Sequence, residues 1–200
     1  MESLFRLSNT SYMTTIEPQM EIVVESLKNN FPLQEYYTPA ELMRDMQLGE
    51  YPQWLSFPVC FRQYEKRGKQ FRDVLGDGMR LILISDRMRD ILLQEKLTGW
   101  KTYPILFYDY QGEEVFGYNG FSIVGRGGNI SCPVDNAIKT IHLSKQEKLY
   151  DVRQWDGTDF FTINMSPFVT ERAMKVMKKT KITSLIFDPI EDYYTLIGME

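Results

Sequence analysis

Two stretches of the chain share one pattern of apolar and polar positions. Residues 84–105, ISDRMRDILLQEKLTGWKTYPI, align without a gap on residues 169–190, VTERAMKVMKKTKITSLIFDPI. Identical or chemically similar residues occupy matching positions, namely Ser85 and Thr170, Arg87 and Arg172, Thr98 and Thr183, and Pro104 and Pro189. Because the match is short, it predicts a shared architecture and does not indicate a reaction.

Each stretch carries the signals of a capped helix. Ser85 or Thr170 is expected at the N-cap, where its hydroxyl accepts a bond from an unpaired amide of the first turn. Apolar residues then recur at helical spacing, as in Met88, Ile91 and Leu92. Gly99 can adopt the left-handed conformation that ends a helix. Ser184 stands at the matching position, so we expect a different exit from the second helix.

Apolar runs on both sides of each helix predict strands. They cover residues 81–84 and 105–108 around the first helix, and residues 160–163 and 185–187 around the second. The predicted unit is therefore strand, helix, strand, present once in 81–108 and once in 160–187. We expect one α+β domain over residues 1–200, with the two units forming one or two lobes.

The same motifs resemble those of a known family. The pattern Ser-x-Arg, an amphipathic helix, Leu-Thr-Gly and a hydrophobic strand with a proline resembles immunity proteins of bacterial polymorphic toxin systems, first catalogued as a domain of unknown function. The fuller match lies in the middle of the chain, at Ser85, Arg87, Leu97, Thr98 and Gly99. In that family the motif typically lies near the C-terminus, where this chain keeps only Arg172 and Thr183.

The resemblance covers roughly residues 71–118 and 159–190. It implies a cytoplasmic protein that neutralises a cognate toxin by binding it. It carries over no catalytic residue and no cofactor.

Composition narrows the class of protein without naming its function. Hydrophobic residues make up 43% and charged residues 25% of the chain, which is typical of a globular domain. No apolar run approaches the roughly 18 residues of a membrane span, and the N-terminus has no signal-peptide core, so we expect a cytoplasmic protein. The net charge of −4 makes a general nucleic-acid binder an unfavoured interpretation.

An enzyme is the least favoured interpretation. His142 is the single histidine, which excludes a two-histidine acid–base mechanism and most zinc sites. A Cys–His pair with Cys60 or Cys132 is formally possible, yet no neighbouring charge indicates a lowered thiol pKa. We therefore assign no catalytic residue, metal or cofactor.

The acidic C-terminal segment is the first candidate for contact with a partner. It combines carboxylates with tyrosines, at Asp188, Glu191, Asp192, Tyr193 and Tyr194. Many toxins are basic nucleases, so a negative surface would steer their encounter. An ordinary solvated strand explains the same residues. A nucleic-acid-associated regulator, using the basic stretches 62–72 and 172–181, is the alternative function.

Three local patterns give further expectations. Thr38, Pro39 and Glu41 form the signature of a capping box, with Gly49 at the end of the helix. Residues 110–113 indicate a hairpin turn. The glycine-rich stretch 125–129 is expected to be a mobile loop, because no helix start follows it as a phosphate-binding loop requires.

Overall fold

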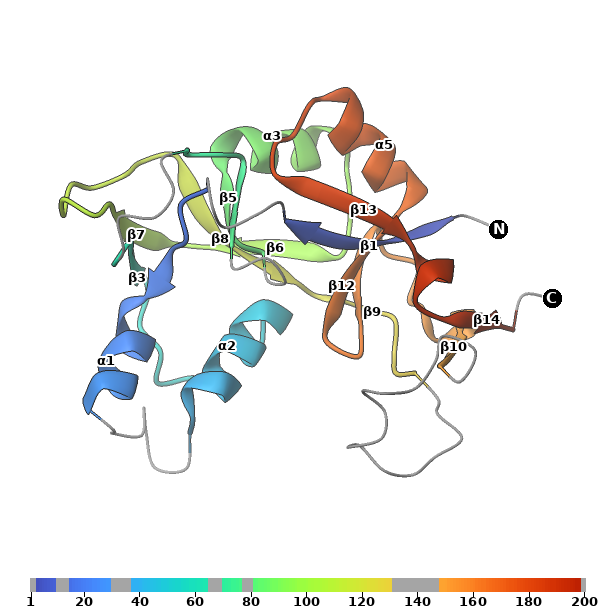
Figure 1. Cartoon of the computed structure of the whole chain (residues 1–200), viewed down its shortest axis with the longest axis horizontal. Helices are drawn as coiled ribbons and strands as arrows, with labels where there is room; N and C mark the ends of the chain where they lie inside the picture. The colour runs from blue at the N-terminus through green and yellow to red at the C-terminus, as the bar shows by residue number, and fades with distance from the viewer. Residues whose placement is uncertain are drawn as a thin grey trace.

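The computed structural model describes residues 3–9, 15–29, 37–64, 70–76, 81–130 and 148–198 and has an α+β fold (Figure 1). Its α-helices in these ranges are α1 (Glu21–Asn29), α2 (Pro39–Leu48), α3 (Asp86–Gln94) and α5 (Glu171–Lys179). The strands of the two larger sheets are β1 (Leu4–Asn9), β4 (Val74–Gly76), β5 (Leu81–Ser85), β6 (Trp100–Tyr103), β8 (Tyr118–Ile123), β9 (Gly125–Arg126), β11 (Phe160–Ile163), β12 (Ser166–Thr170) and β13 (Leu185–Pro189). Smaller elements are β2 (Gln19–Met20), β3 (Val59–Arg62), β7 (Ile105–Tyr108), β10 (Leu149–Asp151), β14 (Thr195–Ile197) and the 3₁₀ turns η2 (Val152–Gln154) and η3 (Ile190–Asp192).

The two larger sheets have the same strand order. The first runs β4-β5-β8-β6, and the second runs β11-β12-β1-β13 with β9 added beside β11. All neighbours within these two sets of four are antiparallel. The N-terminal strand β1 therefore has the same place in the second sheet as β8 has in the first. We call β4, β5, α3, β6 and β8 the first unit, and β11, β12, α5, β13 and β1 the second unit.

The pairing register of the two sheets also corresponds. Ser85 pairs with Tyr118 in the first sheet, and Thr170 pairs with Leu4 in the second. At the other side of the central strand, Trp100 pairs with Ile123 and Leu185 pairs with Asn9. Leu4 and Asn9 each lie 114 positions before their counterparts Tyr118 and Ile123, so β1 and β8 are equivalent residue by residue.

The inner faces of the two sheets share one core with α3 and α5. Phe121 and Ile123 of β8 meet Leu7 of β1, together with buried residues of both helices, namely Met88, Leu92, Ala173 and Met177. The helices lie near one another along the upper side of the molecule in Figure 1. A shared core of this kind buries apolar surface that neither unit covers by itself.

The outer faces are covered by different elements. In the first unit, Leu42 and Met46 of α2 pack against Leu83 and Tyr103 of the sheet. In the second unit, the ring of Tyr194 and other side chains from the C-terminal part cover Phe161 and Phe168, namely Tyr150 and Ile190. The two similar sheets therefore have different elements on their outer faces, α2 on the first and the C-terminal segment on the second.

The predicted helix caps are present. Thr38 and Glu41 form the reciprocal capping box of α2, and Gly49 closes that helix with a φ of 73°. The hydroxyl of Ser85 accepts a bond from the Met88 amide at 3.1 Å. The hydroxyl of Thr170 accepts one from the Ala173 amide at 3.2 Å. These short polar signals fix where three helices begin.

The strands around the helices differ from the predicted units. The strand that enters α5 is β12, whereas residues 160–163 form β11, the preceding strand of a hairpin. The strand that leaves α3 is β6, and residues 105–108 form β7, which pairs with β3 in another sheet. The apolar runs do form strands. Their pairing depends on contacts between distant parts of the chain, which the local sequence does not show.

The exit of the second helix is also not as expected. Ser184 adopts a φ of 70°, in the same left-handed region as Gly99 at 84°. Gly99 does not end α3 as predicted, because the C-caps are Glu95 and Thr180. The residues that follow these caps, Lys96 and Lys181, also match, with φ of 51° and 53°. The two helix exits therefore have one backbone shape, and the packing around Ser184 imposes on a serine a conformation that usually favours glycine.

Residues 125–129 do not form a loose loop. Gly125 and Arg126 form β9, which pairs with β11, and both Gly125 and Gly127 are buried. A Cβ at Gly125 would lie 2.1 Å from the carbonyl oxygen of Phe160. Glycine is thus required here for close backbone packing, which composition alone cannot distinguish from mobility.

The Gly125→Ala variant tests this correction. The added methyl group must displace the backbone of β11, so we expect the free energy of unfolding to fall by roughly 1–3 kcal/mol, measured by urea denaturation. Gly157→Ala is the control, since no atom lies within 4 Å of its Cβ position and only its φ of 82° opposes the change, at about 1 kcal/mol. A smaller loss for Gly125→Ala than for Gly157→Ala would contradict the close packing of β9.

Candidate partner-binding surfaces

A buried carboxylate joins the start of the first unit to the end of the second helix. Asp73 is 8% exposed. Its Oδ1 accepts a bond from the Ser85 hydroxyl at 2.9 Å, and its Oδ2 accepts one from Arg87 at 2.7 Å. The same Oδ2 accepts bonds from the amide and hydroxyl of Thr183 at 2.9 and 3.0 Å. The Asp73 amide donates back to the Thr183 hydroxyl at 2.9 Å.

The second unit repeats this arrangement in the opposite direction. Asp159, 5% exposed, accepts bonds from the Thr170 hydroxyl at 3.0 Å and from Arg172 at 2.9 Å. Its Oδ2 also accepts bonds from the amide and hydroxyl of Thr98, at 2.9 and 3.1 Å. The Asp159 amide donates to the Thr98 hydroxyl at 3.1 Å. We call these two networks the Asp73 clamp and the Asp159 clamp.

The two arginines complete the clamps by reaching the opposite helix. Arg87 donates to the carbonyl of Thr180 at the end of α5, and Arg172 donates to the carbonyl of Glu95 at the end of α3. These carbonyls belong to the last turns, which otherwise lack partners within their helices. Each clamp thus satisfies the helix exit of the other unit.

The sequence pattern identified most of these residues but not the carboxylates. Ser85, Arg87 and Thr98, with Thr170, Arg172 and Thr183, are the aligned positions, and the structure places all six in the clamps. Asp73 precedes Ser85 by 12 residues, whereas Asp159 precedes Thr170 by 11. A gap-free alignment cannot match them. Asp159 directly precedes the predicted strand 160–163, whereas Asp73 precedes β4, for which no strand was predicted.

The aligned prolines lie at strand ends and contribute to strand pairing. Pro104 lies between β6 and β7, and its carbonyl accepts a bond from the Val59 amide at 3.1 Å. Pro189 ends β13 and pairs with Phe5. Neither residue enters a clamp.

The Asp73 clamp shifts the ionisation of its carboxylate. Burial by itself would raise the pKa of Asp73, but hydrogen bonds from Thr183, Ser85 and Arg87 outweigh it and hold the pKa below its ordinary value. A carboxyl group whose pKa is lower in the folded state than in the unfolded state stabilises the fold. The full stabilisation is present when the pH is above the pKa of the unfolded state, and it is lost as the pH falls through the pKa of the folded state. The clamp therefore weakens on acidification.

The predicted effect can be measured with Asp73→Asn. At neutral pH we expect the variant to lose about 2 kcal/mol of stability, because several bonds to a charged acceptor are weakened. Below about pH 4, near the ordinary aspartate pKa, the difference from the unsubstituted chain should shrink. The measurement is the urea midpoint of unfolding for both proteins, at neutral pH and at several lower pH values. Two curves that stay parallel on acidification would show that the Asp73 charge does not hold the clamp.

The acidic segment proposed for partner contact contains both buried and exposed side chains. Tyr194 is 9% exposed and belongs to the core that also holds Phe168, so its ring is not presented to a partner. Tyr193 lies under the guanidinium of Arg6, 4.5 Å from ring centroid to Cζ, and its hydroxyl donates to Asp188 at 3.0 Å. Glu191 and Asp192, in η3, are exposed.

This arrangement places the carboxylates of Asp188, Glu191 and Asp192 on a backbone segment that is held by buried side chains. Ile190 is fully buried immediately before Glu191, and Tyr194 is buried two residues after Asp192. The backbone that carries the exposed acids is therefore anchored at both ends. Anchored charges lose little conformational entropy on binding, which favours their use in recognition.

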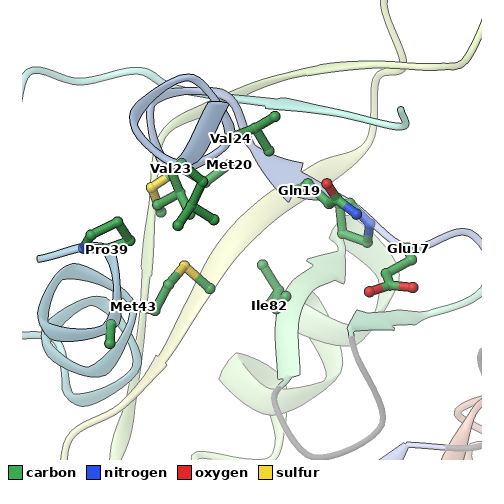
Figure 2. A pocket seen from close by; sticks show the side chains of 11 residues that line it. Glu17, Gln19, Met20, Val23, Val24, Pro39, Met43 and Ile82 are labelled. Atoms are coloured by element: carbon green, nitrogen blue, oxygen red, sulfur yellow. The ribbon is translucent and has the colours of Figure 1, made fainter. Parts of the chain in front are cut away.

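A second candidate surface is an apolar pocket between α1 and α2 (Figure 2). It has a volume of about 440 Å³. Figure 2 shows Met20 and Val23 on one side and Met43 and Ile82 on the others, with Glu17 and Gln19 at the rim. Methionine side chains adapt to irregular apolar shapes, so this pocket has the character of a protein-contact surface.

The basic residues of the nucleic-acid alternative are partly engaged within the chain. Arg62 pairs with Glu21 at 3.3 Å, and Arg172 is held by Asp159 in its clamp. Residues 65–69 lie outside the described ranges. On α5, Lys175 pairs with Glu171 at 3.1 Å, and the other lysines of this helix, Lys178 and Lys179, are exposed. Within the described parts of these two stretches, the exposed cations without an ion pair are Lys178 and Lys179 on α5 and Lys181 just after it.

The environment of Cys60, the described candidate nucleophile, does not favour the reactive thiolate. Burial, followed by a hydrogen bond with Glu21, raises the pKa of the Cys60 thiol to about 11. A thiol of that pKa is almost entirely protonated at neutral pH and is a poor nucleophile. His142 and Cys132 lie outside the described residues.

Comparison with known proteins does not assign the chain to a family. No protein-family model matches it, and no curated protein matches it. Within the described ranges, no helix has the length and apolar character needed to cross a membrane. The resemblance of the Ser-x-Arg and Thr-Gly motifs thus stays an expectation from sequence.

Proposed function

We propose that the chain is an immunity-type protein that neutralises a cognate toxin by binding it directly and occluding its surface, in the cytoplasm of the cell that makes both. The observation that carries this proposal is the rigid acidic surface at η3. Glu191 and Asp192 are exposed on a segment whose neighbours Ile190 and Tyr194 are buried, and Asp188 is half-buried and bonded to Tyr193. Such a surface is complementary to a basic toxin.

The rest of the fold suits a role in binding. The two clamps connect α3 and α5 through their exits, so the sheet that contains β1 and β13 forms a firm support for the acidic segment. A preorganised surface binds with a smaller entropic cost than a flexible one. Occlusion requires only a stable, complementary surface and no reacting group.

The resemblance in the two Ser-x-Arg stretches supports the same function from an independent direction. Ser85, Arg87 and Thr98 of the motif that resembles the immunity family are clamp residues, and the clamps form the frame of the protein rather than its contact surface. A shared frame with variable surfaces is what recognition of different toxins requires. The specificity would then lie in residues outside the motifs.

Charge reversal tests the acidic surface. We expect Glu191→Lys combined with Asp192→Lys to weaken binding of the toxin at least tenfold, which corresponds to about 1.4 kcal/mol. The loss should appear mainly as a slower association rate that depends on salt, because exposed charges at an interface steer encounter. The measurement is surface binding kinetics with the toxin recovered by affinity capture from the native cell.

A matched control changes the net charge equally at another place. Glu113 and Glu114 are exposed beside the turn after β7, and their replacement by lysine should leave the association rate unchanged. Equal weakening by both pairs would indicate a general charge effect and would remove η3 as the contact surface. Capture of nucleic acid in place of a toxin would favour the regulator interpretation.

A further inference from the structure

The strand β13 is the outermost strand of the second sheet, with β1 as its neighbour on one side (Figure 1). The direction of its backbone groups follows from the bonds of β1. The Glu171 amide donates to the Ser3 carbonyl at 2.8 Å, in line with the register between β1 and β12. Successive residues of a strand direct their backbone groups to opposite sides. The odd-numbered residues of β1 therefore face β12, and the even-numbered residues face β13.

This alternation leaves backbone groups of β13 at the open edge of the sheet. The even-numbered residues Arg6 and Ser8 lie opposite Asp188 and Ile186, so these two residues of β13 bond to β1. The residue between them, Phe187, directs its amide and its carbonyl away from β1. Within the described ranges, no other backbone group bonds to the Phe187 amide.

The open edge lacks most of the features that protect an edge strand. Sheet edges usually carry charged residues, bulges or prolines that prevent pairing with another chain. Residues 185–187 are Leu, Ile and Phe, and their register with β1 is regular. Pro189 lies at the end of the strand, at an outward position where its missing N–H breaks no bond to β1. The edge is thus available for pairing from Leu185 to Phe187.

The first unit shows an extended segment at the matching end of its own edge strand. Pro104, which aligns with Pro189, follows β6, and its carbonyl accepts a bond from the Val59 amide at 3.1 Å. Val59 begins β3, which then runs parallel to β7. In the second unit the chain turns into η3 after Pro189, and the described residues place no strand on the open side of β13. A strand added to the second unit therefore pairs with β13 itself.

One charged side chain lies at this edge. The Lys178 ammonium of α5 lies 5.5 Å from the ring centroid of Phe187. Lys178 is exposed and makes no ion pair with the other described residues. A carboxylate opposite Phe187 on an added strand, on the face turned towards α5, would lie beside this ammonium. Opposite charges on neighbouring strands stabilise their pairing, so the edge favours a strand with Asp or Glu at that position.

The same features disfavour a second copy of this chain as the partner. Two copies of β13 paired antiparallel about Phe187 would bring their Lys178 side chains together on one face, and like charges across a strand pair are destabilising. They would also place Pro189 opposite Leu185, where proline has no N–H to donate. A segment of another protein meets neither obstacle.

We propose that the open edge of β13 binds an extended segment of the toxin, which adds a strand to the second sheet through backbone bonds with Leu185 and Phe187. A carboxylate of that segment faces Lys178. Such strand addition takes affinity from main-chain bonds and specificity from the side chains beside them. Past Pro189 the edge leads to the exposed acids of η3, so both belong to one contact. This inference rests on the proposed function and identifies the kind of toxin element that is bound.

Amide hydrogen exchange resolved by NMR tests the backbone pairing directly. In the full chain alone, the Phe187 amide should exchange rapidly. In the complex with the toxin recovered by affinity capture, we expect its exchange rate to fall by roughly a hundredfold or more, because the amide becomes part of a strand ladder. The control is the Thr102 amide, at the matching position of β6, whose exchange rate should not change.

Two results of this measurement would overturn the inference. The first is an exchange rate of the Phe187 amide that stays the same in the complex. The second is protection of this amide in the chain alone. Protection that rises with the concentration of the chain would assign the edge to a second copy.

Charge reversal supplies the second arm of the test. We expect Lys178→Glu to weaken toxin binding about tenfold, or about 1.4 kcal/mol. A more negative chain attracts a basic toxin more strongly in general, so weaker binding indicates a local carboxylate of the toxin. The control is Lys28→Glu, the same charge change at a lysine that lies 4.8 Å from the ring of Tyr64, and it should not weaken binding. Unchanged melting temperatures exclude unfolding as the cause. Full binding by Lys178→Glu, or equal weakening by both variants, would contradict the contact at this edge.

The outcomes separate this inference from the proposed function. If Glu191→Lys with Asp192→Lys weakens binding and the Phe187 amide stays unprotected in the complex, the immunity function stands and strand addition to β13 is wrong. If no toxin is captured with the chain, the immunity function itself fails, and the strand inference fails with it.

Discussion

Two buried aspartates hold the two halves of this protein together, each by accepting bonds from both halves at once. Asp73 binds the start of α3 and the exit of α5, and Asp159 binds the start of α5 and the exit of α3. A buried carboxylate is costly unless its bonds are satisfied, and here hydroxyl, amide and guanidinium groups satisfy both. Separating the halves would remove the Thr183 bonds from Asp73 and the Thr98 bonds from Asp159. The shared core of Leu7, Phe121 and Phe160 adds an apolar contribution to the same union.

The two halves are alike in their frame and unlike in their outer surfaces. Strand order, register, helix caps and helix exits correspond, whereas α2 covers one outer face and the C-terminal segment covers part of the other. Ile186, which is 40% exposed among the described residues, precedes the acidic residues of η3 in the chain. The two halves thus combine one backbone frame with outer faces of different composition.

The sequence predicts the local elements well and the long-range pairing poorly. Ser85, Thr170 and Thr38 locate three helix starts because capping depends on residues a few positions away. The place of β1 beside β12 has no local signal, since it joins residue 4 to residue 170. Gly125 suggested a mobile loop, because the sequence does not show that the carbonyl of Phe160 lies against it. The residue types of the acidic segment predict a candidate contact surface. They do not show that Glu191 is exposed and Tyr194 buried, because this depends on the packing of the folded chain.

Native-state hydrogen exchange is the most direct measurement of whether the clamps unite the two halves. Backbone amides of Phe121 in β8 and Leu7 in β1 lie at equivalent positions of the two sheets. The account predicts that Asp159→Ala lowers the protection of both amides by the same amount, because each clamp serves both units. Loss of protection at Leu7 alone, with Phe121 unchanged, would show two independent units and contradict the account.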